Sequence, residues 1–195
     1  MMQMLNEHAH KNWKKADRMP KIIDNLEENL LSAARRLIAE HGYAAVTMRA
    51  IAKECGVAVG TFYNYYSSKD AMLAACLLHD WQAALAAAGE KTAAAQSAEE
   101  AVETVFSAVR AFEEQNRSIF SDESARSSAA GALQKRHGLL RRQIAALLEE
   151  PCRRFSDVPD GVFLAEFIAE SILSWSGEDI AFSQLWPLLE RLFAK

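Results

Sequence analysis

Three tyrosines within four positions, followed closely by a lysine, are the residues of this sequence whose types and spacing point most directly to chemistry. Tyr63, Tyr65 and Tyr66 share one short segment, and Lys69 follows after two serines. A buried phenol hydroxyl needs a hydrogen-bond partner, so gathering three of them in a hydrophobic core is unfavourable. A hydrated anionic partner would instead use the hydroxyls and the ammonium group. The stretch therefore favours an anion-binding surface over core packing.

The segments that must position these tyrosines follow a plan of helix, short turn and helix. Thr47 is expected to cap a short helix over residues 48–55, and Gly56 is expected to end it. A further helix over residues 58–65 follows after a turn of a few residues. In a helix-turn-helix motif, the first helix braces against the DNA backbone and the second enters the major groove.

The second helix of this plan carries small and polar residues at the positions that would face a partner. Ile51 and Val57 are expected to hold the two helices together, and Gly56 to adopt a turn conformation that a side chain resists. Small side chains allow close approach to DNA, and hydroxyl and amide groups offer hydrogen bonds. The residues expected to point outward are Ala58, Val59, Gly60, Thr61 and Asn64.

The stretch from Ile22 to about Leu78 resembles the DNA-binding domain of the TetR (tetracycline repressor) family of transcriptional regulators. The segment "GYAAVTMRAIAKECGVAVGTFYNYYSSKDAML" is similar to that family's signature, from the end of its first helix into its fourth. The resemblance covers about a third of the chain. It implies an all-helical dimer whose C-terminal domain binds a small molecule.

On the matching positions, the resemblance implies specific DNA contacts. Thr47 and Arg49 would contact phosphate or a base edge, and Lys69 would lie at a phosphate. With Ala58 at a position that is often polar in the family, direct base readout is expected to be thin, and a thymine methyl or DNA shape would supply the rest. Thr61, Tyr63 and Tyr65 would reach the DNA backbone, whereas Tyr66, one turn after Phe62, is predicted to be a core residue.

Composition bounds the fold and the environment of the chain. Half of its 195 residues are hydrophobic and glycine and proline are scarce, which predicts an all-α protein. The net charge is −4, yet residues 1–70 carry a net +2 and residues 71–195 a net −6. Three irregularly spaced cysteines, no apolar stretch near the ~20 residues of a membrane span and no signal peptide predict a cytoplasmic protein.

The helical pattern continues to the end of the chain. We expect a flexible basic arm over residues 1–20, a helix-turn-helix domain over 21–70 and a ligand-binding and dimerisation domain over 71–195. The first helix begins near Ile22 and stops at Gly42. In the second domain we expect helices from Ser68 to about Gly89 and over 98–114, an ambiguous segment at 118–128, and helices over 129–150, 162–176 and 179–194, with a loop at 156–161.

A small-molecule site, if the second domain has one, would draw on apolar and aromatic residues of the middle helices. At helical spacing such residues equally form plain core, and His137 could be either a core histidine or a polar group aimed into a pocket. The acidic balance of this domain hints at a cationic ligand, although Arg110 or Arg117 could meet an anion. The candidate ligand-binding residues are Trp81, Phe106, Val109, Phe120, Leu133, His137 and Leu140.

The last two helices carry small and branched apolar residues that would let helices approach closely. Pairing these helices from two chains gives a four-helix dimer interface, which the resemblance also implies; burial within one chain is the alternative. A dimer suits two recognition helices, which must lie about 34 Å apart to read successive major grooves. The candidate interface residues are Ala165, Ile168, Ala169, Ile172, Leu185, Leu189, Leu192 and Phe193.

The sequence carries no convincing catalytic set, nucleotide-binding loop or cofactor motif, so no enzymatic activity and no cofactor are expected. Cys76, His79 and Asp80 lie close together on one helix but form no complete metal site, and no metal is expected. The expected function is a homodimeric regulator, most simply a repressor, that a small-molecule effector releases from a palindromic DNA operator. A DNA-binding regulator or architectural protein without an effector is the alternative, and a ligand-binding module with decayed DNA contacts or an enzyme is more remote.

Overall fold

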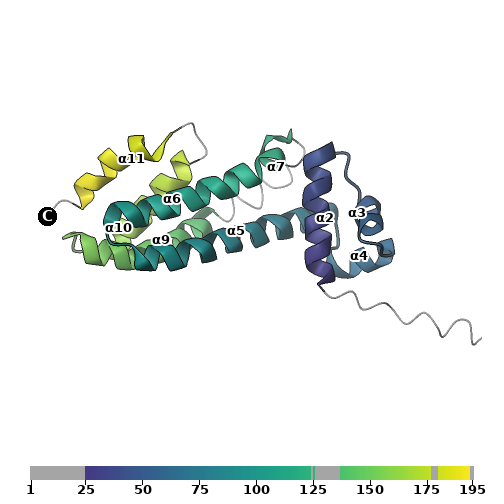
Figure 1. Cartoon of the computed structure of the whole chain (residues 1–195), viewed down its shortest axis with the longest axis horizontal. Coiled ribbons are helices and arrows are strands. Elements are labelled where there is room, and N and C mark those ends of the chain that lie inside the picture. Colours follow the sequence, from purple (N-terminus) through teal and green to yellow (C-terminus); the bar gives the residue numbers. More distant parts are fainter. Residues whose placement is uncertain (1–24, 124, 126–136, 177–179, 194–195) are drawn as a thin grey trace, which may run out of the picture.

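The chain folds into helices that divide between a small head and an elongated body (Figure 1). The computed structural model describes residues 25–123, 125, 137–176 and 180–193. Within these residues every regular element is helical, which confirms the all-α expectation. The elements are α2 (Leu26–His41), α3 (Met48–Glu54), α4 (Val59–Tyr65), α5 (Lys69–Ala94), α6 (Ala98–Gln115), α7 (Arg117–Ser121), α9 (His137–Phe155), α10 (Gly161–Trp175), α11 (Phe182–Leu189) and a 3₁₀ turn, η1 (Glu190–Leu192).

The head consists of α2, α3 and α4 at one end of the molecule (Figure 1). The apolar stripe of α2, including Leu30 and Ile38, is buried, and α2 ends at Gly42, whose φ of 77° is in the left-handed region that favours glycine. Thr47 caps α3 as predicted, because its hydroxyl accepts a hydrogen bond from the backbone N–H of Ala50 at 3.1 Å. The chain thus turns sharply twice and packs three short helices around Ile51 and Phe62, both fully buried.

Helix α5 joins the head to the body. Ser68 caps it by accepting a hydrogen bond from the backbone N–H of Ala71 at 3.0 Å, and its 26 residues span about 39 Å. Its length and apolar composition also fit a membrane span, but a buried core helix has the same two properties. Leu73, Cys76 and Leu77 are buried against the rest of the chain, so α5 has the packing of a core helix.

Two predicted helix ends are wrong. We expected α5 to end near Gly89, yet it continues to Ala94 and Gly89 lies inside it. We expected the helix before the 156–161 loop to end near residue 150, yet α9 continues through a buried Pro151 to Phe155. In both places burial of the helix outweighs the cost of one unfavourable residue, which is about 1 kcal/mol for glycine and about 3 kcal/mol for proline.

The face of α10 that we predicted to pair with a second copy is buried inside the chain. Ala165, Ile168, Ala169 and Ile172 are each 0% exposed and belong to the core shared with α9. Leu185 and Leu189 of α11 are also buried, whereas Leu192 and Phe193 are half-buried. The prediction is therefore wrong for the six buried residues, because a side chain already enclosed by its own chain cannot contact another.

Candidate nucleic-acid interface

The predicted DNA-binding residues gather on the outer surface of α3 and α4 and the segments beside them. Among them, Thr61 and Lys69 are half-buried and the other eight are exposed. The same two helices bury Ile51, Ala52 and Phe62 in the core of the head. The residues on this surface are Thr47, Arg49, Ala58, Val59, Gly60, Thr61, Tyr63, Asn64, Tyr65 and Lys69.

The turn between the two helices depends on Gly56. Its φ is 68°, which is costly for any residue with a side chain. The backbone N–H of Val57 then donates a 2.9 Å hydrogen bond to the carbonyl of Ala52, which closes the turn. Val57 is half-buried and packs on the same core as Ile51, as we expected. The resulting brace holds α4 against α3 and leaves its outer side uncovered.

The three tyrosines divide as predicted between surface and core. Tyr63 and Tyr65 are 49% and 45% exposed, whereas Tyr66 is 6% exposed and packs its ring 5.7 Å from that of Phe62. The Tyr66 hydroxyl donates to the Glu27 carboxylate at 3.3 Å. Burial, with the nearby Glu27 charge, raises the pKa of Tyr66 above its ordinary value. Tyr66 therefore supports the head, and Tyr63 and Tyr65 remain accessible to a partner.

Lys69 has a structural partner as well as a position near the surface. Its Nζ donates to the Tyr43 carbonyl at 2.9 Å and lies 4.1 Å from the centre of the Tyr43 ring. The Tyr43 backbone N–H in turn donates to Asp122 at 2.9 Å. These bonds attach the loop between α2 and α3 to the start of α5 and to the segment after α7. An ammonium group has three N–H donors, so this arrangement leaves Lys69 able to meet a phosphate.

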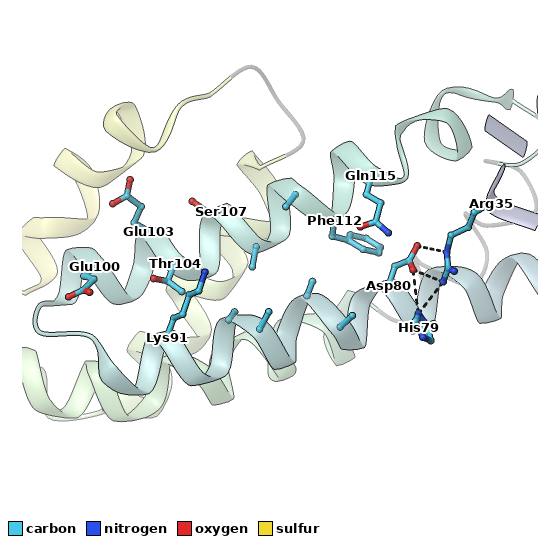
Figure 2. A pocket seen from close by; sticks show the side chains of 16 residues that line it. Arg35, His79, Asp80, Lys91, Glu100, Glu103, Thr104, Ser107, Phe112 and Gln115 are labelled. Carbon is cyan, nitrogen blue, oxygen red and sulfur yellow. Dashed lines mark hydrogen bonds and ion pairs between the residues drawn. The ribbon is translucent and has the colours of Figure 1, made fainter. Parts of the chain in front are cut away.

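A cleft of about 750 Å³ lies between α5 and α6, in the body (Figure 2). Alanines of both helices, such as Ala84 and Ala108, line its middle. Charged and polar groups stand at its two ends. Lys91, Thr104, Glu100 and Glu103 lie toward one end, and Arg35, His79, Asp80 and Gln115 toward the other.

An ion pair between the head and the body closes one end of this cleft. Arg35 of α2 contacts Asp80 of α5 through two bonds, with Nε to Oδ2 at 3.1 Å and Nη2 to Oδ1 at 2.5 Å. Arg35 Nη2 also lies 3.1 Å from Nδ1 of His79. Because a guanidinium only donates hydrogen bonds, Nδ1 of His79 is the acceptor. The Asp80 side chain is 4% exposed and that of Arg35 is 24% exposed, so the carboxylate is the more deeply buried partner.

The predicted ligand-binding residues do not line this cleft. Trp81, Phe106 and Val109 are buried core residues, and Phe120 and Leu140 are half-buried against the same core. The Trp81 indole donates to Gln143 at 2.9 Å, and its ring packs edge-on against Phe112, 5.2 Å between centres. These side chains therefore belong to the core and do not line this cleft, and their role in binding a ligand stays a prediction.

His137 is exposed at the start of α9 and lies 3.6 Å from Glu170 of α10, so it is neither a core histidine nor part of the cleft. Leu133 lies outside the described residues.

Sequence reasoning missed the cleft residues and the outer face of α10. A charged residue on α2 and another on α5 give no sign in the sequence that they meet, since 45 positions separate Arg35 from Asp80. A signal for α10 was available: "GVFLAEFIAESILSW" is apolar on nearly all sides, which is typical of a helix covered on both faces.

Within the part of the chain that the structure describes, no three His, Cys, Asp or Glu side chains are grouped as a metal site would need. The three cysteines are free. Burial raises the pKa of the Cys76 and Cys152 thiols to about 12, and it raises that of Cys55 as well. Such thiols are poor nucleophiles and poor metal ligands near neutral pH.

Comparison with known proteins points to one family. Residues 30–76 match the family model described as "Bacterial regulatory proteins, tetR family". The chain is 40% identical over 57 residues to the HTH-type transcriptional regulator UidR of Escherichia coli K12, which covers 29% of each protein. It is 37% identical over 54 residues to the regulator HbdR of Aromatoleum sp. strain CIB, covering 28% of this chain and 24% of that one. The match thus spans less than a third of these relatives' length.

Solved structures share the fold over most of the chain. Salmonella enterica GusR aligns with a TM-score of 0.58 at 21% identity, covering 89% of this chain and 98% of its own. FadR from Bacillus subtilis, solved in complex with stearoyl-CoA, aligns with a TM-score of 0.53 at 22% identity, covering 86% and 97%. At these identities the likeness extends to the fold alone. The match to the tetR family of bacterial regulatory proteins thus covers the helix-turn-helix head, and the likeness to solved structures extends to the fold of the rest of the chain.

Proposed function

We propose that the protein is a cytoplasmic, DNA-binding transcriptional regulator without enzymatic activity. The observation that carries the proposal is the outer surface of α3 and α4, where ten residues of DNA-contacting type lie together at one end of the molecule. Exposed Arg49, Tyr63 and Tyr65 supply phosphate contacts, and Gly60 allows a close approach of α4 to the groove. The regulators UidR and HbdR, which share this segment, support the same role.

The active form in this proposal is a homodimer on a palindromic operator. The outer face of α10 supports it, because Phe163 is 66% exposed and Phe167, one turn later, is 49% exposed. Val162 and Trp175 of the same helix are also about half exposed. Such a set of large apolar side chains on one helix is typical of an interface. We therefore assign dimerisation to this outer face in place of the inner face that the sequence analysis favoured.

A small-molecule effector is the second part of the proposal. The cleft between α5 and α6 supports it, since its volume suits a small organic ligand. FadR of Bacillus subtilis was solved with stearoyl-CoA, so one protein of this fold holds a ligand. An effector that binds better to one conformation of the head than to another would release the operator. Most simply, the protein is then a repressor.

The test is binding of the purified full-length protein to DNA from immediately upstream of its own gene. Fluorescence anisotropy at several salt concentrations, with a scrambled duplex as the control, separates specific from non-specific binding. We expect specific binding to a site with two half-sites about one helical turn apart. Equal, salt-steep binding to both duplexes would contradict an operator in this DNA and favour the alternative, an architectural protein without an effector.

A further inference from the structure

We propose that the cleft between α5 and α6 is the effector site, and that it binds a slender organic dication, one end of which replaces Arg35 on Asp80. The inference rests on the proposed function, because it names the ligand class and the coupling of that regulator. It is carried by the burial of the Arg35–Asp80 pair, by the spacing of the two ends of the cleft and by the charges at each end.

The unequal burial of Arg35 and Asp80 decides the sign of the ligand's charge. A ligand carboxylate would have to pull Arg35 away and leave Asp80, whose side chain is 4% exposed, without a counter-charge. An unpaired buried charge is strongly destabilising. A ligand cation would instead take the place of Arg35, whose side chain is already 24% exposed and can move into water. Exchange of one cation for another is therefore the favourable reaction at this end.

The charges at the far end of the cleft also favour one positive charge on the ligand. Glu100 and Glu103 line it together with Lys91, which leaves one negative charge in excess. The Glu100 carboxylate accepts a 2.7 Å hydrogen bond from the backbone N–H of Gln96, which holds it at the start of α6. Charge complementarity therefore favours a second cationic group here.

The distance between the two ends and the lining between them define the shape of the ligand. Asp80 and Lys91 are separated by eleven positions on α5, or about 16 Å along the helix. The lining between them is mostly alanine from both helices, including Ala84, Ala87 and Ala111, together with Ser107 and Phe112. Methyl groups favour an unbranched hydrocarbon chain and offer it no hydrogen bonds. An α,ω-diamine with about ten methylene groups matches this length.

The same exchange couples the ligand to the head. Arg35 belongs to α2, and its bonds to Asp80 and His79 are a polar connection between the head and α5. A dication on Asp80 breaks this connection and loosens the position of α2 on α5. By linkage, the factor by which the dication weakens operator binding equals the factor by which the operator weakens dication binding.

The experiment uses 1,10-diaminodecane as the probe and isothermal titration calorimetry on the full-length protein. The matched compounds are 1,10-decanediol, which has the same chain without charge, decanedioate, which has the opposite charge, and 1,4-diaminobutane, which is too short. We expect the long diamine to bind, the short one to bind at least about tenfold more weakly, and the diol and the dioate not to bind in the same concentration range.

Variants locate the site. Asp80→Asn and Glu103→Gln should each weaken binding of the diamine, the first by at least about tenfold. Glu99→Gln is the control. Glu99 is an exposed acid on α6, the helix of Glu103, but it does not line the cleft. Arg35→Gln should tighten binding, since the competing cation is gone. If Asp80→Asn does not fold, the comparison of the four compounds on the unchanged protein still decides the charge.

Operator binding measured on the same samples separates this inference from the proposed function. Specific DNA binding that the diamine weakens, and that Arg35→Gln makes insensitive to the diamine, supports both. Specific DNA binding that decanedioate weakens and the diamine does not would overturn the dication and leave the regulator standing. Equal binding of the diamine to the unchanged protein and to Asp80→Asn would also overturn the inference. Absence of specific DNA binding would contradict the regulator, while the calorimetry would still assign the cleft.

Discussion

At the residue scale, two glycines of the head place opposite demands on the backbone. Gly56 has a φ of 68° with no atom within 4 Å of an added Cβ, so the cost of Gly56→Ala comes from the backbone alone. We expect this change to lower the free energy of unfolding by about 1–2 kcal/mol. Gly60 lies inside α4 and also has no neighbour near an added Cβ, so Gly60→Ala should raise the free energy of unfolding by about 0.5–1 kcal/mol.

Urea unfolding of both variants checks this pair, and DNA anisotropy adds a second readout. If α4 lies in the major groove with Gly60 against the DNA, Gly60→Ala weakens DNA binding although it stabilises the protein. Stronger binding by Gly60→Ala would contradict that placement of α4.

The tyrosines give a second prediction at this scale. Tyr63→Phe and Tyr65→Phe each remove an exposed hydroxyl, and each should weaken DNA binding roughly 2- to 10-fold, the value of one hydrogen bond. Tyr66→Phe removes the bond to Glu27 and should change stability by about 1 kcal/mol, with DNA affinity unchanged. Anisotropy and urea unfolding on the three variants separate the two roles. A loss of DNA affinity in Tyr66→Phe alone would reverse the assignment.

Lys69 gives a third prediction. If its ammonium group meets a phosphate, Lys69→Ala should weaken binding to specific and scrambled DNA alike and lower the salt slope by about one. Because Lys69 also holds the Tyr43 carbonyl, the control is a variant that weakens the attachment of the same loop through another bond and keeps Lys69. Tyr43→Phe removes the hydrogen bond from the Tyr43 hydroxyl to Asp70 and changes no charge. The salt slope of DNA binding by this variant should therefore match that of the unchanged protein. An unaltered slope in Lys69→Ala would place Lys69 away from DNA.

At the element scale, the junction of α6 with the end of α10 contains a half-buried carboxyl group. Desolvation by burial raises the pKa of Glu113 above its usual 4.5, although the Ser176 hydroxyl and Arg110 act in the opposite direction. Ser176 donates to Glu113 at 3.1 Å, and Arg110 donates to the Ile180 carbonyl at 2.7 Å. Glu113 therefore connects α6 to the end of α10. Its protonated form is favoured more strongly than that of an exposed glutamate.

This carboxyl group predicts the pH dependence of stability. Because the pKa of Glu113 is higher in the folded than in the unfolded state, its contribution to stability is present below about pH 4.5 and is lost as pH rises through the folded value. Glu113→Gln, which cannot ionise, should therefore gain stability relative to the unchanged protein between pH 4 and 7. Thermal unfolding across this pH range measures the difference. A difference that stays constant with pH would show that Glu113 ionises normally.

At the scale of the whole molecule, dimerisation should depend on the outer face of α10. Phe167→Asp removes a large apolar contact from this face and adds a charge, and it should raise the dimer dissociation constant roughly thirtyfold or more. The control is Leu139→Asp, because Leu139 is similarly exposed at 45% but lies on α9. Sedimentation equilibrium measures both variants. If Leu139→Asp dissociates the dimer and Phe167→Asp does not, the interface lies elsewhere.

The same variant links assembly to DNA recognition. A single head contacts one half-site, so a monomeric Phe167→Asp protein should lose most of its preference for a palindrome over a half-site. Anisotropy with duplexes carrying one or two half-sites tests this. An unchanged preference would indicate that the heads recognise DNA independently of the α10 face.

The sequence by itself determined the head of this protein. Thr47, Gly56 and Ser68 act within a few residues of their own position, so the cap, the turn and the next cap could be predicted from residue types. The division of Tyr63 and Tyr65 from Tyr66 also followed from helical spacing, because residues four positions apart share a face. The roles of the exposed residues on DNA remain predictions.

Tertiary structure alone decided the rest. Both sides of α10 are apolar, and packing against α9 decides which side faces inward. The sequence pattern therefore predicted that Ile168 and Ile172 form the interface, whereas the exposed face carries Phe163 and Phe167. Tertiary packing also set the partners of the aromatic residues, since Trp81 contacts Phe112 of the next helix and Phe106 contacts Phe182 of α11. The Arg35–Asp80 pair at the end of the cleft joins segments 45 positions apart. Local pattern reports which residues share a helix face, whereas the partner of each face is set by how all the helices pack together.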